Sequence, residues 1–219
     1  MEASDHASDV MEATNHMSDA GANAHEKAFG GLEGIDIPKD MVKMIAERRA
    51  KVPAKRLHHH AYRCRNAEET RHFYEDILGF KLVQAAIMSR DFDEADNNFC
   101  HMFFEIADGS AIAFFDCTGS MITRSFEHDS GFDHHIALYV ESDEDMNYYK
   151  ARLDAAKIPN SYVDHIVYRS LYCNDPNGLN LEFCGNAPIT PEYELKAELI
   201  AHRDLETWMK FAHNKQDAS

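Results

Sequence analysis

Two histidine-rich segments and one late glutamate are the residues in this chain best suited to bind a metal ion. His59 lies in the run LHHHAYR, His135 lies in the similar run DHHIALYV, and Glu182 lies in the apolar run LNLEF. Two imidazoles and one carboxylate can bind one face of a divalent ion and leave its other positions open. Such a set is typical of non-haem Fe(II) oxygenases.

The two histidine runs match in register. Side chains two positions apart share one face of a strand, so Ala61 lies beside His59 and Ala137 lies beside His135. These small neighbours leave room for a ligand. Because the pattern occurs twice, it favours metal binding over ordinary strand histidines. The competing candidates are the adjacent histidines His58, His60 and His134, which strand alternation or register is expected to turn away from the metal.

Glu182 is a charged residue inside an apolar strand pattern. Burying an ionised carboxylate is costly unless it is paired or binds a metal. Counted from the preceding turn glycine, the equivalent residue of the first segment is Ala113, so we predict three protein ligands and not four. The alternative is a glutamate at a strand edge that faces water.

Hydrophobic periodicity predicts the same order of elements after each histidine run. The first series comprises strand His59–Cys64, helix Ala67–Leu78, and strands Lys81–Met88, Phe99–Ile106 and Ala111–Asp116. The second comprises strand His135–Val140, helix Asp145–Ala156, and strands near Tyr162–Val163, Ser170–Cys173 and Leu179–Cys184. We therefore expect an α+β fold in which two tandem βαβββ modules form a curved mixed sheet around a metal site.

These modules, residues 56–118 and 132–186, form one predicted domain over residues 56–186, with a helical segment on each side. Residues 35–55 contain a predicted helix from Ile37 to Lys51. Residues 187–219 contain a helix over Glu192–Phe211, which we expect to pack at a subunit interface.

The first 34 residues predict a disordered tail. They begin with a tandem decapeptide, MEASDHASDV and MEATNHMSDA, which is acidic and rich in small residues. A segment of this composition cannot bury enough apolar surface to fold alone. Its histidines, His6 and His16, are therefore interpreted as solvated residues and not as metal ligands.

Composition narrows the class of protein. A formal charge of −16 disfavours nucleic acid and anionic membrane surfaces as partners. No apolar run is long enough to span a bilayer, and no signal peptide is expected at the start. The five cysteines lack the spacing of a disulfide framework, so reduced thiols in a cytoplasmic protein are expected.

The duplicated βαβββ pattern resembles the vicinal oxygen chelate superfamily, which includes glyoxalases, bleomycin-resistance proteins and extradiol dioxygenases. The resemblance covers about Arg56–Asn186, and FYEDILGF is a motif general to that superfamily. The stretch that begins VDH, continues with LY and DPNG, and ends at Glu182 is similar to the type I extradiol ring-cleavage signature.

This resemblance implies specific roles. His59, His135 and Glu182 would bind Fe(II), with Mn(II) or another divalent metal as the alternative. His165 and Tyr172 would hold and polarise a catechol-like substrate for its reaction with O2. One departure concerns Ser110, which stands where that family usually has a histidine; His101, on the preceding strand, is a candidate to compensate.

The sequence thus predicts an Fe(II)-dependent extradiol-type dioxygenase, in a homo-oligomer, acting on a catechol or related vicinal diol. The rival is a non-redox isomerase, epimerase or lyase that uses a metal as a Lewis acid, which Ser110 favours. A third possibility is a binding protein that has kept the fold without turnover.

Overall fold

The computed structural model describes residues 32, 34–89, 98–118, 134–165, 168–186 and 190–216. The chain divides into two compact units. One comprises residues 53–161 and 171–184, and the other comprises residues 1–52, 162–170 and 185–219. His6 and His16 of the predicted tail lie outside the described residues. The domain boundaries expected from the sequence stay predictions.

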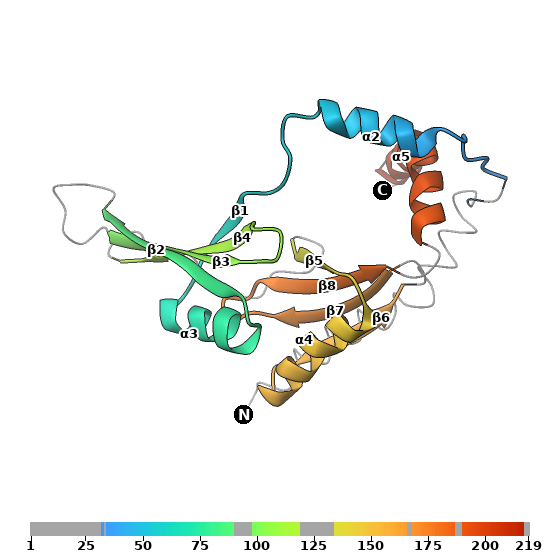
Figure 1. Ribbon diagram of the computed structural model, residues 1–219. Coiled ribbons are helices and arrows are strands. Elements are labelled where there is room, and N and C mark those ends of the chain that lie inside the picture. Colours follow the sequence, from blue (N-terminus) through green and yellow to red (C-terminus); the bar gives the residue numbers. More distant parts are fainter. Residues whose placement is uncertain are drawn as a thin grey trace. The chain divides into compact units, whose positions relative to one another are not determined.

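The first module forms a four-stranded sheet in the order β1-β4-β3-β2 (Figure 1). Strand β1 runs parallel to β4, whereas β3 is antiparallel to both β4 and β2. In register, His59 of β1 pairs with Ala111 of β4. The strands are β1 (His59–Arg63), β2 (Lys81–Ser89), β3 (Asn98–Glu105) and β4 (Ala111–Cys117).

The second module repeats this arrangement, with the order β5-β8-β7-β6. Its elements are β5 (Ile136–Val140), helix α4 (Asp143–Ala155), β6 (Asn160–Asp164), β7 (Tyr168–Asn174) and β8 (Asn180–Asn186). Because both sheets have the same strand order and each has a helix after its first strand, the predicted α+β fold of two tandem βαβββ modules is confirmed.

The helix of the first module differs from the expected single α-helix over Ala67–Leu78. It begins as α3 (Ala67–Arg71) and continues as the π-helix η1 (His72–Ile77). The backbone N–H of Leu78 donates to the carbonyl of Phe73, five residues earlier, at 2.9 Å. A π-helical turn is not visible in a 3.6-residue pattern, which explains why the sequence did not reveal it.

A side-chain pair spans this wider turn. Arg71 donates to both carboxylate oxygens of Asp76, five residues later, at 2.9 and 2.8 Å. The same guanidinium also binds Glu68. Together the two carboxylates raise the pKa of the Arg71 side chain far above its usual value, so it stays charged. The ion pairs therefore support the π-helical geometry at the helix surface.

The strands of both modules have one face in the core and one face away from it. Residues that alternate along each strand form a single apolar cluster with the helix side chains Phe73, Tyr74 and Leu78. The strand members of this cluster include Met102, Phe104, Ile112, Phe114, Leu171, Cys173, Leu181 and Phe183. The opposite faces are thereby left to His59, His101, Ala113, Tyr172 and Glu182.

The turn between β7 and β8 joins the two modules through the buried carboxylate of Asp175. One carboxylate oxygen accepts the backbone N–H groups of Asn177 and Leu179, each at 2.8 Å. The other accepts the Tyr74 hydroxyl of the first module at 3.1 Å. Burial raises the pKa of Asp175, because the protein interior solvates a charge poorly.

Asn177, in the same turn, extends this connection. Its side-chain oxygen accepts the backbone N–H of Arg65 at 2.8 Å, and its amide donates to the Thr70 hydroxyl at 3.2 Å. The guanidinium of Arg65 also donates to the carbonyl of Pro176 at 2.8 Å. The turn that precedes β8 is therefore fixed to the segment that follows β1.

Arg152 of α4 makes the reciprocal contact. Its guanidinium donates to the backbone carbonyls of Asp76 and Ile77, at the end of η1. A cation is favourable at the carbonyl end of a helix. Each module thus supplies polar groups that form hydrogen bonds with the other module.

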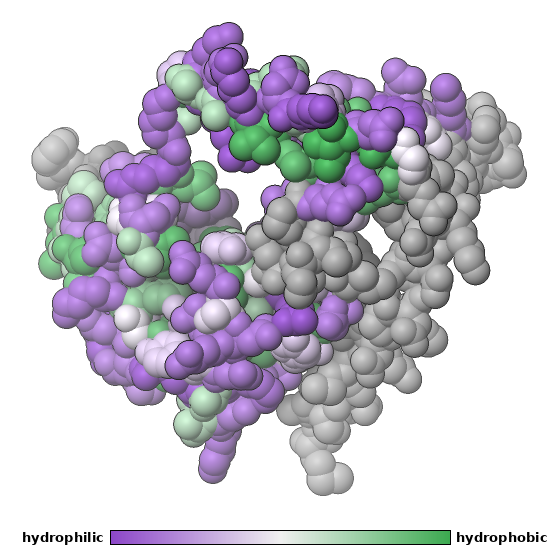
Figure 2. Space-filling model, turned by 45° about the vertical axis from the view of Figure 1, so that its right-hand side comes forward, coloured by the Kyte–Doolittle hydropathy of each residue, from purple (hydrophilic) through white to green (hydrophobic). Residues whose placement is uncertain are grey.

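Helices α2 (Met41–Lys51) and α5 (Thr190–Gln216) belong to the other compact unit. An ion pair of 2.8 Å joins Arg48 to Glu198 beside a groove between the two helices. Hydrophobic residues gather over this region in Figure 2. Exposed apolar side chains on α5 include Leu199, Leu205, Trp208 and Met209.

Two expectations from the composition, on membrane spans and on cysteines, can be compared with the structure. Within the described part of the chain, no helix has the length and apolar composition that crossing a bilayer requires. All five cysteines are free thiols. Burial raises the pKa of Cys64 and of Cys173 to about 12, so both stay protonated and unreactive at neutral pH.

Replacing Asp175 with Asn should destabilise the fold. The carboxylate accepts hydrogen bonds on both oxygens, and an amide would turn a donor toward the Tyr74 hydroxyl or toward a backbone N–H. We expect a loss of about 1–3 kcal/mol in the free energy of unfolding, measured by urea denaturation. The matched control, Asp154→Asn, alters an exposed ion pair with Lys150 and should change stability by less than about 0.5 kcal/mol. Equal effects of the two changes would contradict the role given to Asp175.

Candidate metal centre

The structure brings together three of the residues selected from the sequence. Glu182 is the third residue of β8 and is only 8% exposed. One of its carboxylate oxygens lies 3.3 Å from Nε2 of His135. The other accepts the hydroxyl of Tyr172 at 2.9 Å.

The positions of these residues follow from strand alternation. Leu181 and Phe183 point into the core, so Glu182 between them points to the opposite face. Tyr172 lies on β7, next to β8 in the sheet, and His135 directly precedes β5, the other neighbour of β8. A nearly buried carboxylate is thus held by one neighbour on each side, which offsets its loss of water.

His135 and Glu182 are suitable as two ligands of one ion. Metal–nitrogen and metal–oxygen bonds of about 2.0–2.2 Å place adjacent ligand atoms about 3 Å apart, close to the separation found here. Among the described residues, however, no three His, Cys, Asp or Glu side chains form a group that could hold a metal. The structure therefore brings one histidine and one carboxylate together, and metal binding by His59, His135 and Glu182 stays a prediction.

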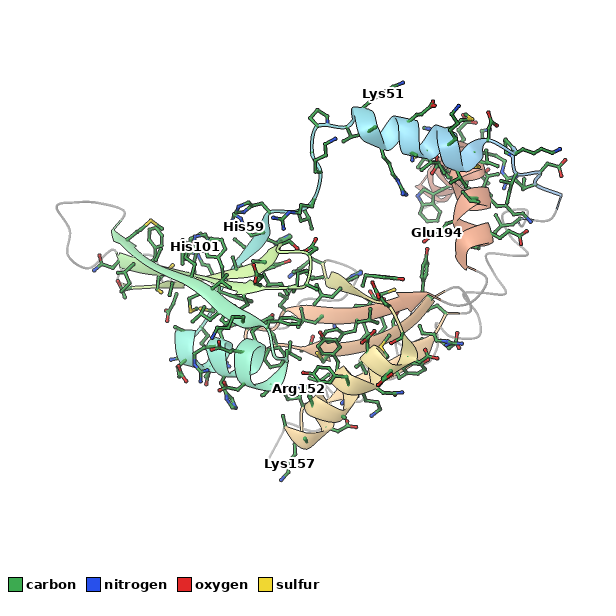
Figure 3. The ribbon with its side chains drawn as sticks, in the orientation of Figure 1. Lys51, His59, His101, Arg152, Lys157 and Glu194 are labelled. Atoms are coloured by element: carbon green, nitrogen blue, oxygen red, sulfur yellow. The ribbon has the colours of Figure 1, made fainter. Side chains whose placement is uncertain are left out.

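His59 has its own set of neighbours on the first sheet. Its ring centroid lies 5.0 Å from that of His58, 5.7 Å from that of His101 and 5.1 Å from that of Phe103. Figure 3 labels His59 and His101 on this sheet. The Nδ1 atoms of His58 and His59 are 2.8 Å apart, the distance of a hydrogen bond.

The contact between His58 and His59 has a chemical consequence. One Nδ1 must donate and the other must accept. When His59 donates, its Nε2 keeps a lone pair that can bind a metal, and His58 orients the ring as an outer partner. His58 was expected to turn away, but it precedes β1, so strand alternation does not govern its direction.

The other two competing histidines lie with Tyr62. His60 stacks on the Tyr62 ring at 4.4 Å, and His134 stacks on it at 6.0 Å. Tyr62 packs against the core cluster, so its strand face is opposite to that of His59. Alternation therefore separates His60 from His59, as expected.

Two further positions bear on the predicted chemistry. Ala113 is the third residue of β4, as Glu182 is of β8, and it is fully buried beside Ala61. Ser110 is also buried, and its hydroxyl donates to Asp108 at 2.5 Å. The Ser110 hydroxyl is thus engaged within its own turn.

His165 lies just after β6, where its backbone N–H donates to the carbonyl of Tyr168 at 2.8 Å. Both residues belong to the compact unit that contains residues 162–170, whereas Glu182 belongs to the other. The substrate-holding role expected for His165 therefore stays a prediction.

Residues 56–183 match the family model described as the Glyoxalase/Bleomycin resistance protein/Dioxygenase superfamily. This match covers more than half of the chain and spans both modules as far as residue 183. The chain belongs to this superfamily. The membership confirms the resemblance to the vicinal oxygen chelate proteins seen in the sequence.

The chain is also similar to several solved structures of other proteins. A glyoxylase/bleomycin resistance protein/dioxygenase domain from Frankia sp. EAN1pec is 17% identical, with a TM-score of 0.48, and covers 61% of this chain and 99% of its own. The fosfomycin resistance protein FosX from Listeria monocytogenes, with Mn(II), is 18% identical, with a TM-score of 0.47 and coverages of 64% and 98%.

A lactoylglutathione lyase from Agrobacterium tumefaciens is 18% identical, with a TM-score of 0.44, and covers 61% of this chain and 96% of its own. No curated protein sequence matches the chain.

Metal content tests the ligand set. His135→Ala and Glu182→Ala should each abolish tight binding of Fe(II) or Mn(II), because a three-ligand site cannot spare one donor. His59→Ala should do the same. Metal retained after anaerobic dialysis against a weak chelator is measured by elemental analysis.

The neighbouring histidines supply graded controls. His58→Ala should weaken affinity by about 10–100-fold, because only the partner of a ligand is lost. His60→Ala should leave affinity unchanged. Full occupancy in Glu182→Ala, or equal losses in the His59 and His60 variants, would contradict the assignment.

Proposed function

We propose that this chain is an Fe(II)-dependent extradiol-type dioxygenase that acts on a catechol or related vicinal diol. The observation that supports this most directly is the nearly buried Glu182 carboxylate between His135 and Tyr172. His59 would be the third ligand. Alanine at the position equivalent to Glu182 keeps the ligand number at three, so the site would remain open to substrate.

The chain's own residues would bind and orient the reactants. Tyr172 holds one oxygen of Glu182, which leaves the other directed toward His135. Bound Fe(II) would supply Lewis acidity toward the diol and redox chemistry with O2. Tyr172, and His165 if it reaches the substrate, would assist proton movement. Extradiol cleavage breaks the ring C–C bond between one hydroxyl-bearing carbon and its neighbour without a hydroxyl. Both atoms of O2 end in the ring-opened product, so no further reductant is needed.

A specific observation favours a second candidate. The buried Ser110 hydroxyl donates to Asp108, so it offers no acid–base group on the first module. A non-redox isomerase, epimerase or lyase would need the metal, which could then be Mn(II), only as a Lewis acid. This reaction would proceed without oxygen.

We also infer that the protein is a cytoplasmic homo-oligomer in which α2 and α5 meet a second copy. Exposed Leu205, Trp208 and Met209 give α5 an apolar surface. The last turn of α2 is basic, with Arg48, Arg49 and Lys51, whereas the whole chain carries a charge of −16. A second copy therefore offers both an apolar surface and opposite charge. Five free thiols support a reducing compartment.

Oxygen consumption tests the proposed function. The Fe(II)-loaded protein should consume one O2 per catechol without added reductant, measured with an oxygen electrode across a panel of substituted catechols. Tyr172→Phe should lower turnover by about 10²–10⁴-fold, because it removes the hydroxyl that would assist proton transfer.

A different set of results would contradict the dioxygenase. Metal-dependent turnover of a non-aromatic substrate under anaerobic conditions, together with no O2 uptake for any catechol, would replace the dioxygenase with the Lewis-acid enzyme. Catechol binding without any turnover would indicate the binding protein.

The oligomer can be followed through Trp208, the single tryptophan of the chain, which is 51% exposed in one copy. Its emission should shift to the red on dilution, as the mass from light scattering falls to that of a monomer. Leu205→Glu should give the monomer at all concentrations. The control Val83→Glu, at an exposed position outside this unit, should not. A wild-type chain that stays monomeric would contradict the inference.

A further inference from the structure

His101 has a buried polar atom that the fold itself does not use. Among the described residues, its Nε2 is the one buried side-chain nitrogen or oxygen without a hydrogen-bond partner. Folded proteins pair nearly all such atoms, because an unpaired one loses its contact with water and gains nothing. A phenylalanine would fill the same space without this loss. The imidazole therefore needs another explanation.

The surroundings of His101 are aromatic. Its ring stacks on Phe115 with centroids 3.9 Å apart and an interplanar angle of 17°. Phe103 lies at 4.2 Å, and Phe99 packs edge-on against Phe115 at 5.6 Å. All four rings are half-buried on the sheet face opposite the core. They form an aromatic cluster in which Nε2 of His101 is buried without a hydrogen-bond partner.

Small residues flank this aromatic cluster in the sheet. Ala86 of β2 pairs with His101 in register, and Ala113 of β4 pairs with Phe103. The ring centroid of the predicted ligand His59 lies 5.7 Å from that of His101. Nδ1 of His59, however, already pairs with His58. The aromatic cluster thus adjoins His59, the predicted third ligand, and supplies no predicted ligand itself.

We propose that His101 is a substrate-binding residue: its Nε2 hydrogen-bonds an oxygen substituent of a planar aromatic substrate whose ring packs on Phe103 and Phe115. The proposal rests on the proposed function, since it places the substrate beside the same centre. It adds the residue that recognises the substrate and restricts the substrate to oxygenated aromatic rings. Aromatic rings favour stacked or edge-on partners, and the imidazole supplies the orienting polar contact.

Replacing His101 with Phe separates a substrate contact from a structural role. The variant keeps an aromatic ring against Phe115 and removes only the unpaired nitrogen. The melting temperature should therefore stay equal or rise, and bound Fe(II) should be unchanged. The dissociation constant for 4-nitrocatechol, followed anaerobically by its visible spectrum with the Fe(II)-loaded protein, should increase by about tenfold, the effect of one lost hydrogen bond.

Two further variants sharpen the test. His101→Asn places an amide on the same strand and should recover part of the lost affinity. His72→Phe removes an imidazole that is exposed and bound to Asp76, so affinity for 4-nitrocatechol should not change.

An unchanged dissociation constant in His101→Phe would overturn the proposal, as would a wild-type protein that does not bind 4-nitrocatechol. A lower melting temperature that accompanies the lost affinity would also overturn it, since that pattern marks a structural residue. Binding that depends on His101 without O2 uptake would uphold this proposal and reject the dioxygenase. O2 uptake with a His101-independent affinity would do the reverse.

Discussion

The rest of this structure depends on the hydrogen bonds that the buried carboxylate of Asp175 accepts. It fixes the turn before β8 by accepting two backbone N–H groups, and it binds Tyr74 of the first module. Glu182 lies on the strand that this turn begins. The segment it contacts follows the strand that carries His59. One polar network therefore sets the position of the second module's carboxylate against the first module's histidines, and a carboxylate that is costly to bury serves this purpose because all its acceptors are used.

Much of the fold was predictable because it is encoded by strand alternation and by repetition. Alternation placed Glu182 on the face opposite Leu181 and Phe183, and repetition gave Ala113 as its equivalent in the first module. The fold class followed from the same two signals. The pair of His135 and Glu182 was also selected from the sequence, although its distance could come only from the structure.

What the sequence did not reveal depends on tertiary contacts. The π-helical turn lies within a sequence pattern that is typical of an ordinary α-helix. Arg71 and Asp76 are five residues apart, a spacing at which an α-helix does not bring side chains together, so the sequence did not predict their ion pair. His58 was expected to turn away, but it lies before the strand in which alternation begins. The hydrogen bond from Tyr172 to Glu182 joins two strands, so no local pattern shows it, and the substrate-holding role expected for Tyr172 stays a prediction. The unpaired nitrogen of His101 cannot be inferred from any local pattern, because pairing depends on every neighbouring element.

Ala113 bears on how the two modules diverged after a duplication. Duplication of a module supplies each position twice, so an ancestor with identical halves would have placed two carboxylates opposite each other. A fourth protein donor tends to close a metal site, whereas catalytic sites keep a position for substrate. If the predicted ligands bind a metal, divergence at this one strand position would turn a symmetric site into an asymmetric one with an open side. In such a lineage, the loss of a side chain from one copy would be the step that made chemistry accessible.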